Sequence, residues 1–240
     1  MRTKRLLSIV LLVLLALPAW AAFPVIEGSN SSRETGIPTE HTVALPAGIV
    51  SGELLLVFFS TASGTSNAVT WPSGWTEYFE VNQGTNAKLN GAYRQADGTE
   101  GASITVTTSL GRRSAHSSYR ISGAEDPATQ VPESSTATGL STDGDPPSLT
   151  PTGGSKDYLW FAAIGISADD SAMGAPTNYA NLLNQATANP SLGSADRSLN
   201  AASEDPGTFT SINASWAVAT VAVHPSGAPP AAVRRKVVVY

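Results

Sequence analysis

Three histidines, His41, His116 and His224, are the first candidates for acid–base chemistry in this sequence. A serine hydrolase would also need a G-x-S-x-G turn, whereas the segment 165–169 lacks the second glycine. No two histidines stand at zinc-ligand spacing, and the chain has no Cys to supply a thiolate ligand or nucleophile. Alternation along residues 115–122 places His116 on a polar strand face, where we expect a solvated ring. The sequence therefore predicts no catalytic residue.

Carboxylates offer a second kind of chemistry, because paired Asp or Glu residues hydrolyse glycosides and bind calcium. Most of the acidic pairs stand beside Gly, Pro or Ser, where acidic residues form turns and favour solubility. The best calcium candidates are hard oxygen ligands in predicted loops, namely Asp143, Asp145, Asp169 and Asp170. The full EF-hand spacing is absent. We therefore predict no cofactor, with calcium as the alternative.

Aromatic side chains could bind a sugar, because their faces pack on the apolar faces of sugar rings. Trp71 and Trp75 flank the turn Pro72-Ser73-Gly74, and Tyr78 follows within the same segment. These three residues are the candidate ligand-binding platform. Trp160 and Trp216 lie in wholly apolar segments and are predicted to belong to the core.

Charge argues against nucleic acid as a partner. The formal net charge of the 240 residues is −5, but the basic residues cluster at the two ends. Without Arg2, Lys4, Arg5 and the cluster 234–236, eight basic residues face nineteen acidic ones, a net charge of −11. Such a body is unsuited to phosphate contacts.

The first 22 residues have the order of a secretory signal peptide. A positive start precedes the apolar run Leu6–Leu17, which Pro18 ends, and Ala19-Trp20-Ala21 is an A-x-A cleavage site. An uncleaved anchor is the alternative, and no later stretch is long and apolar enough to span a membrane. We expect a secreted protein whose mature chain begins near residue 22 or 23.

After the signal, short apolar or alternating runs between Gly, Pro, Asn and Asp predict an all-β protein. We expect a two-sheet antiparallel β-sandwich, jelly-roll-like, in one domain over residues 23–225. No internal repeat of convincing period is visible. Three segments, 54–59, 158–164 and 216–223, are apolar on both faces and should be central strands covered by loops or a neighbouring subunit. The predicted strands are 41–45, 53–61, 68–71, 75–81, 88–95, 103–108, 115–122, 157–166, 179–185, 197–203 and 213–224, with one or two more possible within 23–27 and 130–151.

Residues 226–240 form a predicted linker and an interaction tail. Pro229-Pro230 separates the sandwich from a basic cluster and a strand-forming end, which together comprise Arg234, Arg235, Lys236, Val237, Val238, Val239 and Tyr240. An unpaired strand can add to an exposed sheet edge, so we expect the tail to dock on its own or a neighbouring subunit. A disordered, solvated tail is the alternative.

Several punctuated motifs resemble a poorly characterised group of jelly-roll-like modules of tailed phages and environmental bacteria. The resemblance covers about residues 40–225. It implies a virion-appendage or surface-binding protein, and it brings no catalytic residues. The motifs that carry it are Ser51-Gly52-Glu53-Leu54-Leu55-Leu56, Trp71-Pro72-Ser73-Gly74-Trp75-Thr76, Tyr93-Arg94-Gln95-Ala96-Asp97-Gly98-Thr99-Glu100, Tyr119-Arg120-Ile121-Ser122-Gly123 and residues 216–223.

These observations predict a secreted, non-enzymatic surface or virion-appendage binding module, with a glycan or a surface protein as partner. One alternative is a carbohydrate-binding module or polysaccharide-active enzyme. Another is a self-assembling extracellular structural protein, which the doubly apolar segments and the detached tail suggest.

Overall fold

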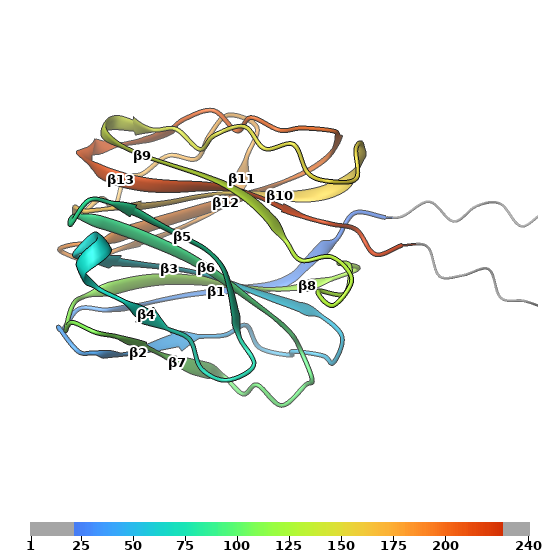
Figure 1. Cartoon of the computed structure of the whole chain (residues 1–240), viewed down its shortest axis with the longest axis horizontal. Coiled ribbons are helices and arrows are strands. Elements are labelled where there is room, and N and C mark those ends of the chain that lie inside the picture. Colours follow the sequence, from blue (N-terminus) through green and yellow to red (C-terminus); the bar gives the residue numbers. More distant parts are fainter. Residues whose placement is uncertain (1–21, 228–240) are drawn as a thin grey trace, which may run out of the picture.

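The computed structural model describes residues 22–227, and these form a β protein with one short 3₁₀ turn (Figure 1). No helix in this part of the chain is long and apolar enough to cross a membrane. The strands are β1 (Val25–Glu34), β2 (Glu40–Ala44), β3 (Leu54–Ala62), β4 (Val69–Thr70), β5 (Thr76–Gln83), β6 (Ala87–Gln95), β7 (Ser103–Thr108), β8 (Ser114–Ser122), β9 (Glu133–Gly144), β10 (Lys156–Ile166), β11 (Ala180–Ala186), β12 (Ser191–Ala201) and β13 (Phe209–Val223), with the turn η1 (Gly64–Ser66) after β3.

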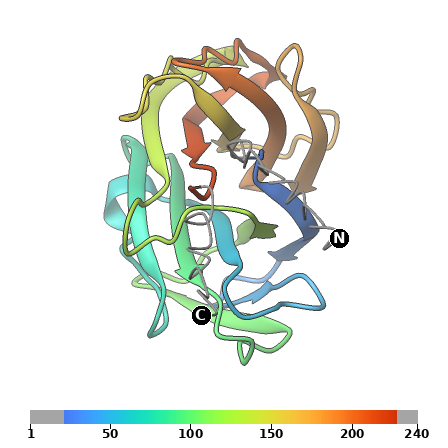
Figure 2. The same ribbon diagram turned by 90° about the vertical axis from the view of Figure 1, so that its right-hand side faces the viewer.

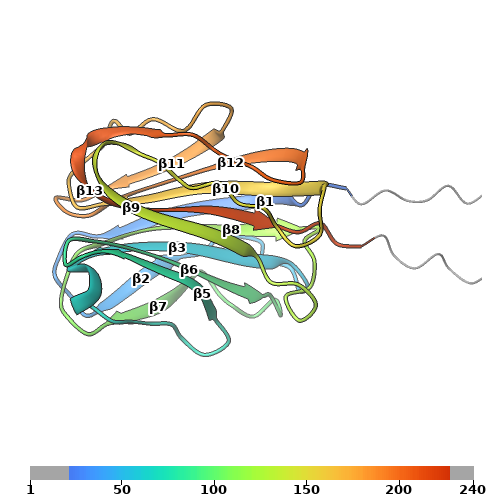
Figure 3. The same ribbon diagram turned by 45° about the horizontal axis from the view of Figure 1, so that its top comes forward.

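The strands form three antiparallel sheets in layers (Figures 1 and 3). The two large sheets have the orders β1-β8-β3-β6-β5 and β11-β12-β10-β13-β9. A third sheet, β2-β7-β4, lies on the outer side of the first. The predicted all-β antiparallel sandwich is confirmed. The expectation of two sheets omitted the small third one, and the jelly-roll order is not confirmed, because each large sheet comes from one half of the chain.

The main core lies between the inner faces of the two large sheets. Alternate residues of β3, including Leu56 and Phe58, meet alternate residues of β10, including Phe161. Phe58 contacts the Phe161 ring edge-on, with a centroid separation of 5.8 Å. This two-residue period is the one that the sequence pattern predicts for a strand with a buried face.

The doubly apolar segments are covered on their outer faces as well, as predicted. The outer face of β3 packs against the third sheet, where Phe59 and Val57 meet Val43 and Val106. The outer faces of β10 and β13 are covered by side chains of the same chain, namely Leu149, Met173 and Tyr179 from loops and Phe209 from the start of β13. Both coverings come from the chain itself, so a neighbouring subunit is not required to bury these segments.

The two halves of the chain share one topology. The five strands of each large sheet can be ranked by their order in the chain. Read from β1 in the first sheet and from β9 in the second, both sheets then have the order first-fifth-second-fourth-third. The registers also correspond: Leu56 of β3 lies opposite Tyr93 of β6, as Phe161 of β10 lies opposite Asp196 of β12. Both hairpins, β5–β6 and β11–β12, carry a bulge near the start of their first strand. The structure therefore contains an internal repeat, which the sequence analysis missed.

The repeat extends to the outer layers. Where the third sheet covers the first half, the loops over the second half make two isolated antiparallel bridges, Leu149–Glu204 and Gly174–Thr210. Leu149–Glu204 corresponds to the pairing of β2 with β7, and Gly174–Thr210 corresponds to the pairing of β4 with β7. Each of these strand pairings of the first half is replaced by a single residue pair in the second half. The molecule is thus two similar units packed face to face through their large sheets.

Both ends of the described chain leave the sandwich at the same side, on the right in Figure 1, which faces the viewer in Figure 2. Ser226 N donates to Gly123 O at 2.8 Å, which ties the end of the second unit to the end of the first. The opposite end carries η1 and several loops, and we call it the distal end.

Candidate functional site

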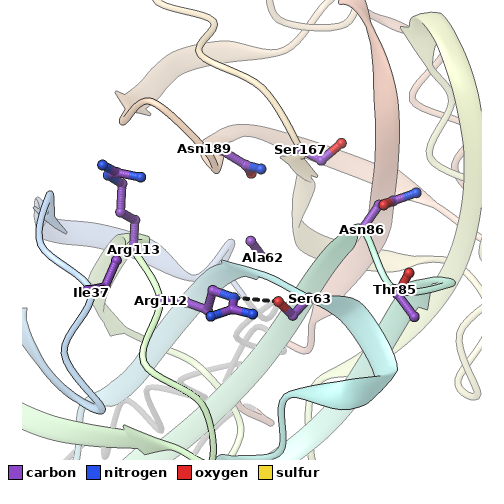
Figure 4. A pocket seen from close by; sticks show the side chains of 9 residues that line it. All are labelled: Ile37, Ala62, Ser63, Thr85, Asn86, Arg112, Arg113, Ser167 and Asn189. Carbon is purple, nitrogen blue, oxygen red and sulfur yellow. Dashed lines mark hydrogen bonds between the residues drawn. The ribbon is translucent and has the colours of Figure 1, made fainter.

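A cavity of about 330 Å³ opens at the distal end, over the seam between the two units (Figure 4). The first unit supplies most of its wall and the second supplies Ser167 and Asn189. Two of the nine lining residues are arginines and none is acidic. The lining residues are Ile37, Ala62, Ser63, Thr85, Asn86, Arg112, Arg113, Ser167 and Asn189.

Neutral oxygens hold the arginines at this end in place. Arg112 donates through Nε to Ser63 Oγ and through Nη1 to Gly111 O, the latter at 2.7 Å. Arg113 Nε donates to Thr35 O at 2.8 Å. Beside them, Arg33 Nη1 donates to Ala186 O at 2.7 Å. These contacts fix the guanidinium groups but leave their charges uncompensated.

Most of the other basic side chains in the described part of the chain are paired with a carboxylate. Four of them, Lys88, Arg94, Arg120 and Arg197, form ion pairs with Glu or Asp. Lys156, at the start of β10 and so at the opposite end, forms no ion pair with another described residue. Uncompensated arginines therefore gather at one cavity of an otherwise acidic body.

The loops that shape the cavity pack backbone against backbone. Gly64 begins η1 with φ of +42°, and a Cβ atom there would lie 2.0 Å from Gly84 O. Thr65 N donates to that same carbonyl at 2.9 Å. Only glycine permits this approach, which brings Ser63 and Thr85 to one wall.

Amide groups complete the other wall. Asn189 Oδ1 is buried without a hydrogen-bond partner, and Asn86 Nδ2 donates to Ser215 Oγ of the second unit at 3.4 Å. Guanidinium groups recognise carboxylate, sulfate or phosphate through paired N–H donors. With hydroxyls and amides around them, the arrangement can bind an anionic group on a hydroxyl-rich ligand.

The predicted aromatic platform is only partly assembled. Trp71 and Trp75 stack with centroids 6.3 Å apart and an interplanar angle of 23°. Trp75 is buried in the cluster under the third sheet, and Trp71 is half-buried beside it. Tyr78 instead packs with Phe79 at the inner core, on the other face of the first sheet. One tryptophan edge, rather than three rings, is therefore available to a ligand.

A polar cluster adjoins that tryptophan. Trp71 Nε1 donates to Glu77 Oε2 at 2.8 Å, and Asn90 Nδ2 donates to the same oxygen at 2.7 Å and to Glu80 Oε2 at 3.3 Å. Burial alone would raise the pKa of Glu80, but hydrogen bonds from Lys88, Asn82 and Asn90 and the Lys88 charge lower it. A carboxyl group with a lowered pKa is poorly suited to act as a glycosidase acid.

The four predicted calcium ligands are not gathered into one site. Asp143, Asp145 and Asp169 are exposed, whereas Asp170 is buried and accepts from Ala172 N at 3.0 Å and Ile212 N at 3.0 Å. Asp170 therefore joins its own loop to the first residues of β13. No group of three or more potential metal ligands occurs among residues 22–227.

The prediction that His116 is solvated is wrong. The third sheet covers this part of the first sheet, so His116 is fully buried and its ring stacks on Phe59 with centroids 5.1 Å apart. His41 is fully buried beside it, and His224 is buried near Tyr158. Alternation identified two faces of β8 but gave no sign that the polar one is covered.

His116 and His41 belong to a chain of hydrogen bonds with one direction. Ala44 N donates to Ser32 Oγ at 3.0 Å, and Ser32 Oγ lies 2.8 Å from His116 Nδ1. Ser114 Oγ lies 2.7 Å from both His116 Nε2 and His41 Nδ1. Ser32 Oγ accepts from Ala44 N and can donate its own proton to His116 Nδ1, which leaves His116 Nε2 to donate to Ser114.

The other end of this chain enforces the same direction. His41 Nε2 lies 2.9 Å from Thr108 Oγ1, which donates to Leu110 O at 2.9 Å. That bond uses the only hydroxyl proton of Thr108, so His41 must donate to Thr108 through Nε2. With both rings neutral, Ser114 then donates to His41 Nδ1 and accepts from His116 Nε2, and both rings are Nε2–H tautomers. Burial, followed by the charge of His41, lowers the pKa of His116 to about 3, and burial also lowers the pKa of His41.

Two further predictions concern residues outside the described range. The predicted signal peptide, residues 1–22, lies outside the described residues except for its last residue, and the interaction tail Arg234–Tyr240 lies wholly within residues 228–240. In comparisons with known proteins, no family, no curated protein and no solved structure matches the chain.

Sequence reasoning missed the distal cavity. Its one sequence signal is Arg112-Arg113, two adjacent arginines in an acidic body. Ser167 and Asn189 follow more than fifty residues later and belong to the other unit. The packing of the two units places Ser167 and Asn189 at the same cavity as Arg112 and Arg113.

Proposed function

We propose that the protein is a secreted, non-enzymatic binding module that holds an acidic glycan residue in the distal cavity. The observation that carries this proposal is the pair Arg112 and Arg113, which line a polar cavity and have no carboxylate partner among residues 22–227. The volume of about 330 Å³ lies at the lower end of ligand pockets, roughly 300–1,000 Å³, and suits one sugar residue.

The position of the cavity also supports a binding role. Both ends of the described chain leave at the opposite side of the sandwich, so an attachment there would leave the distal loops open to a ligand (Figure 1). Loops held by a rigid β scaffold commonly carry binding residues.

The runner-up is a polysaccharide-active enzyme at the Trp71 edge, because Glu77 and Glu80 lie close together there. The lowered pKa of Glu80 argues against this residue as the general acid of such an enzyme. A glycan-binding role for the half-buried Trp71 stays as the second candidate.

Replacing the cavity arginines should weaken the binding of acidic oligosaccharides. We expect Arg112→Gln or Arg113→Gln to reduce affinity about 10- to 100-fold, since a hydrogen bond to a charged group contributes roughly 1.5–3 kcal/mol. A glycan array containing uronic-acid, sulfated and neutral sugars identifies the probe, and titration calorimetry measures its affinity.

Lys156→Gln is the matched control, because it removes one unpaired positive charge from the opposite end. It should leave affinity unchanged within about twofold. If Lys156→Gln weakens binding as much as Arg112→Gln does, or if only neutral sugars bind, the proposed site is wrong.

A further inference from the structure

We propose that a groove at Asp196 receives the basic cluster Arg234-Arg235-Lys236 of the chain's own C-terminal segment. This groove is separate from the distal cavity, and the proposal does not depend on the glycan-binding role. It rests on a comparison between the two units of the repeat, on an uncompensated buried carboxylate and on where the described chain ends.

The groove lies at a corner that is filled in the first unit and open in the second. By register, Asp196 and Leu182 occupy the positions that Tyr93 and Tyr78 occupy in the first unit. There the two tyrosine rings pack together with centroids 6.0 Å apart. In the second unit, two cavities of about 330 and 230 Å³ meet at this corner and share Ile26, Asn181 and Asp196.

Asp196 places a carboxylate in this space without a cation. Its side chain is on the inner side of β12, its exposed fraction is 9%, and both of its carboxylate oxygens accept only from Asn181 Nδ2, at 3.1 and 3.2 Å. It forms no ion pair within residues 22–227. Burial raises the pKa of this carboxyl group. A buried carboxylate in such surroundings is stabilised by a positive charge.

The rest of the groove suits the stem of a long basic side chain. Its walls combine apolar groups, among them Leu183 and Leu159, with the Tyr119 hydroxyl. That hydroxyl bonds to Ser194 Oγ at 2.6 Å. Lys and Arg bury an aliphatic stem along apolar surface while the charged head reaches a polar partner.

The C-terminal segment starts beside this groove. Ser226 N is bonded to Gly123 O, and a Cβ atom on Gly123 would lie 3.7 Å from Phe23 O. Phe23 itself lines the smaller of the two cavities. Residues 228–233 separate Gly227 from the basic cluster, and six residues can span about 20 Å. The cluster brings three positive charges to an acidic body.

Carbodiimide coupling in the mature full-length chain tests the proposal, because it joins a carboxylate to an amine only where the two are in contact. We expect mass spectrometry to find an Asp196–Lys236 link that Asp196→Asn abolishes. Asp157→Asn, which removes a carboxylate near the start of β10 but not from the groove, should retain it. Hydrogen exchange of amides 232–240 should be at least tenfold slower in the wild type than in Asp196→Asn.

A second variant, Arg234→Gln/Arg235→Gln/Lys236→Gln, tests the same contact without changing the sandwich and should accelerate exchange equally. Mixing ¹⁴N- and ¹⁵N-labelled protein separates links within a chain from links between chains. Mixed-isotope links would assign the groove to a neighbouring copy and overturn docking within the chain. Equal exchange in the wild type and both variants, with no link at Asp196, would overturn the proposal altogether.

Discussion

Lowering the pH from 7 to 4 is expected to reduce the free energy of unfolding by about 3 kcal/mol through His116 alone. The folded-state pKa of His116 is lowered to about 3, whereas an unfolded histidine titrates near 6.5. Below pH 6.5 the unfolded chain binds a proton that the folded protein excludes. The stabilisation is therefore complete above pH 6.5 and is lost as the pH falls toward 3.

Burial is the main reason why the folded protein excludes this proton, and the hydrogen bonds of His116 act in the same direction. A protonated His116 would donate from both nitrogens, whereas Ser32 already donates to Nδ1. A proton at Nδ1 would turn Ser32, which already accepts from Ala44 N, from a donor into an acceptor. The larger cost is the burial of the charged ring.

Urea unfolding between pH 4 and 7 measures this effect in the wild type and in His116→Gln, which keeps a donor on the side chain. The variant should lose about 1.4 kcal/mol of pH dependence per pH unit. If it is too unstable for this comparison, the imidazole chemical shifts of the wild type report the titration directly. A folded-state His116 that titrates near pH 6.5, or equal pH slopes in both proteins, would contradict the account.

Trp160→Ala should cost about 3–5 kcal/mol of unfolding free energy, as large aromatic truncations in packed cores do. The Trp160 side chain is fully buried in the outer cluster of the second sheet, and its Nε1 donates to Leu199 O at 3.1 Å. The substitution leaves a cavity and also leaves that carbonyl without its indole donor.

Trp75→Ala provides the informative comparison. Had Trp75 been a rim residue of a sugar platform, its truncation should cost much less than that of Trp160. The structure buries Trp75 against Trp71 under the third sheet, so we expect a loss of similar size. Denaturant melts of both variants decide, and a loss below about 1 kcal/mol for Trp75→Ala would contradict this packing.

Strand positions were largely predictable, because alternation and turn residues are local signals. The predicted strand 103–108 coincides with β7, and the predicted strand 157–166 differs from β10 by one residue. The burial of His116 was not predictable in this way. Its strand alternates between apolar and polar residues as a half-exposed strand would, and the sheet that covers the polar face is built from residues 40–44, 69–70 and 103–108.

The internal repeat was hidden because the shared features are registers and bulges rather than identical residues. Tyr93 corresponds to Asp196 and Leu56 to Phe161, pairs that preserve strand geometry without preserving side-chain chemistry. The distal cavity was hidden for a related reason. Its walls combine Arg112 with Asn189, and only the packing of the two units brings them together.

The most direct test of the proposed function is to locate the bound ligand by NMR, titrating the protein with an acidic oligosaccharide selected on the array. We predict that chemical shifts change at Ser63, at Asn189 and at the Nε–H groups of Arg112 and Arg113. The Trp71 indole N–H should not shift. Perturbations centred on Trp71, with the arginine signals unmoved, would contradict the assignment of the distal cavity as the binding site.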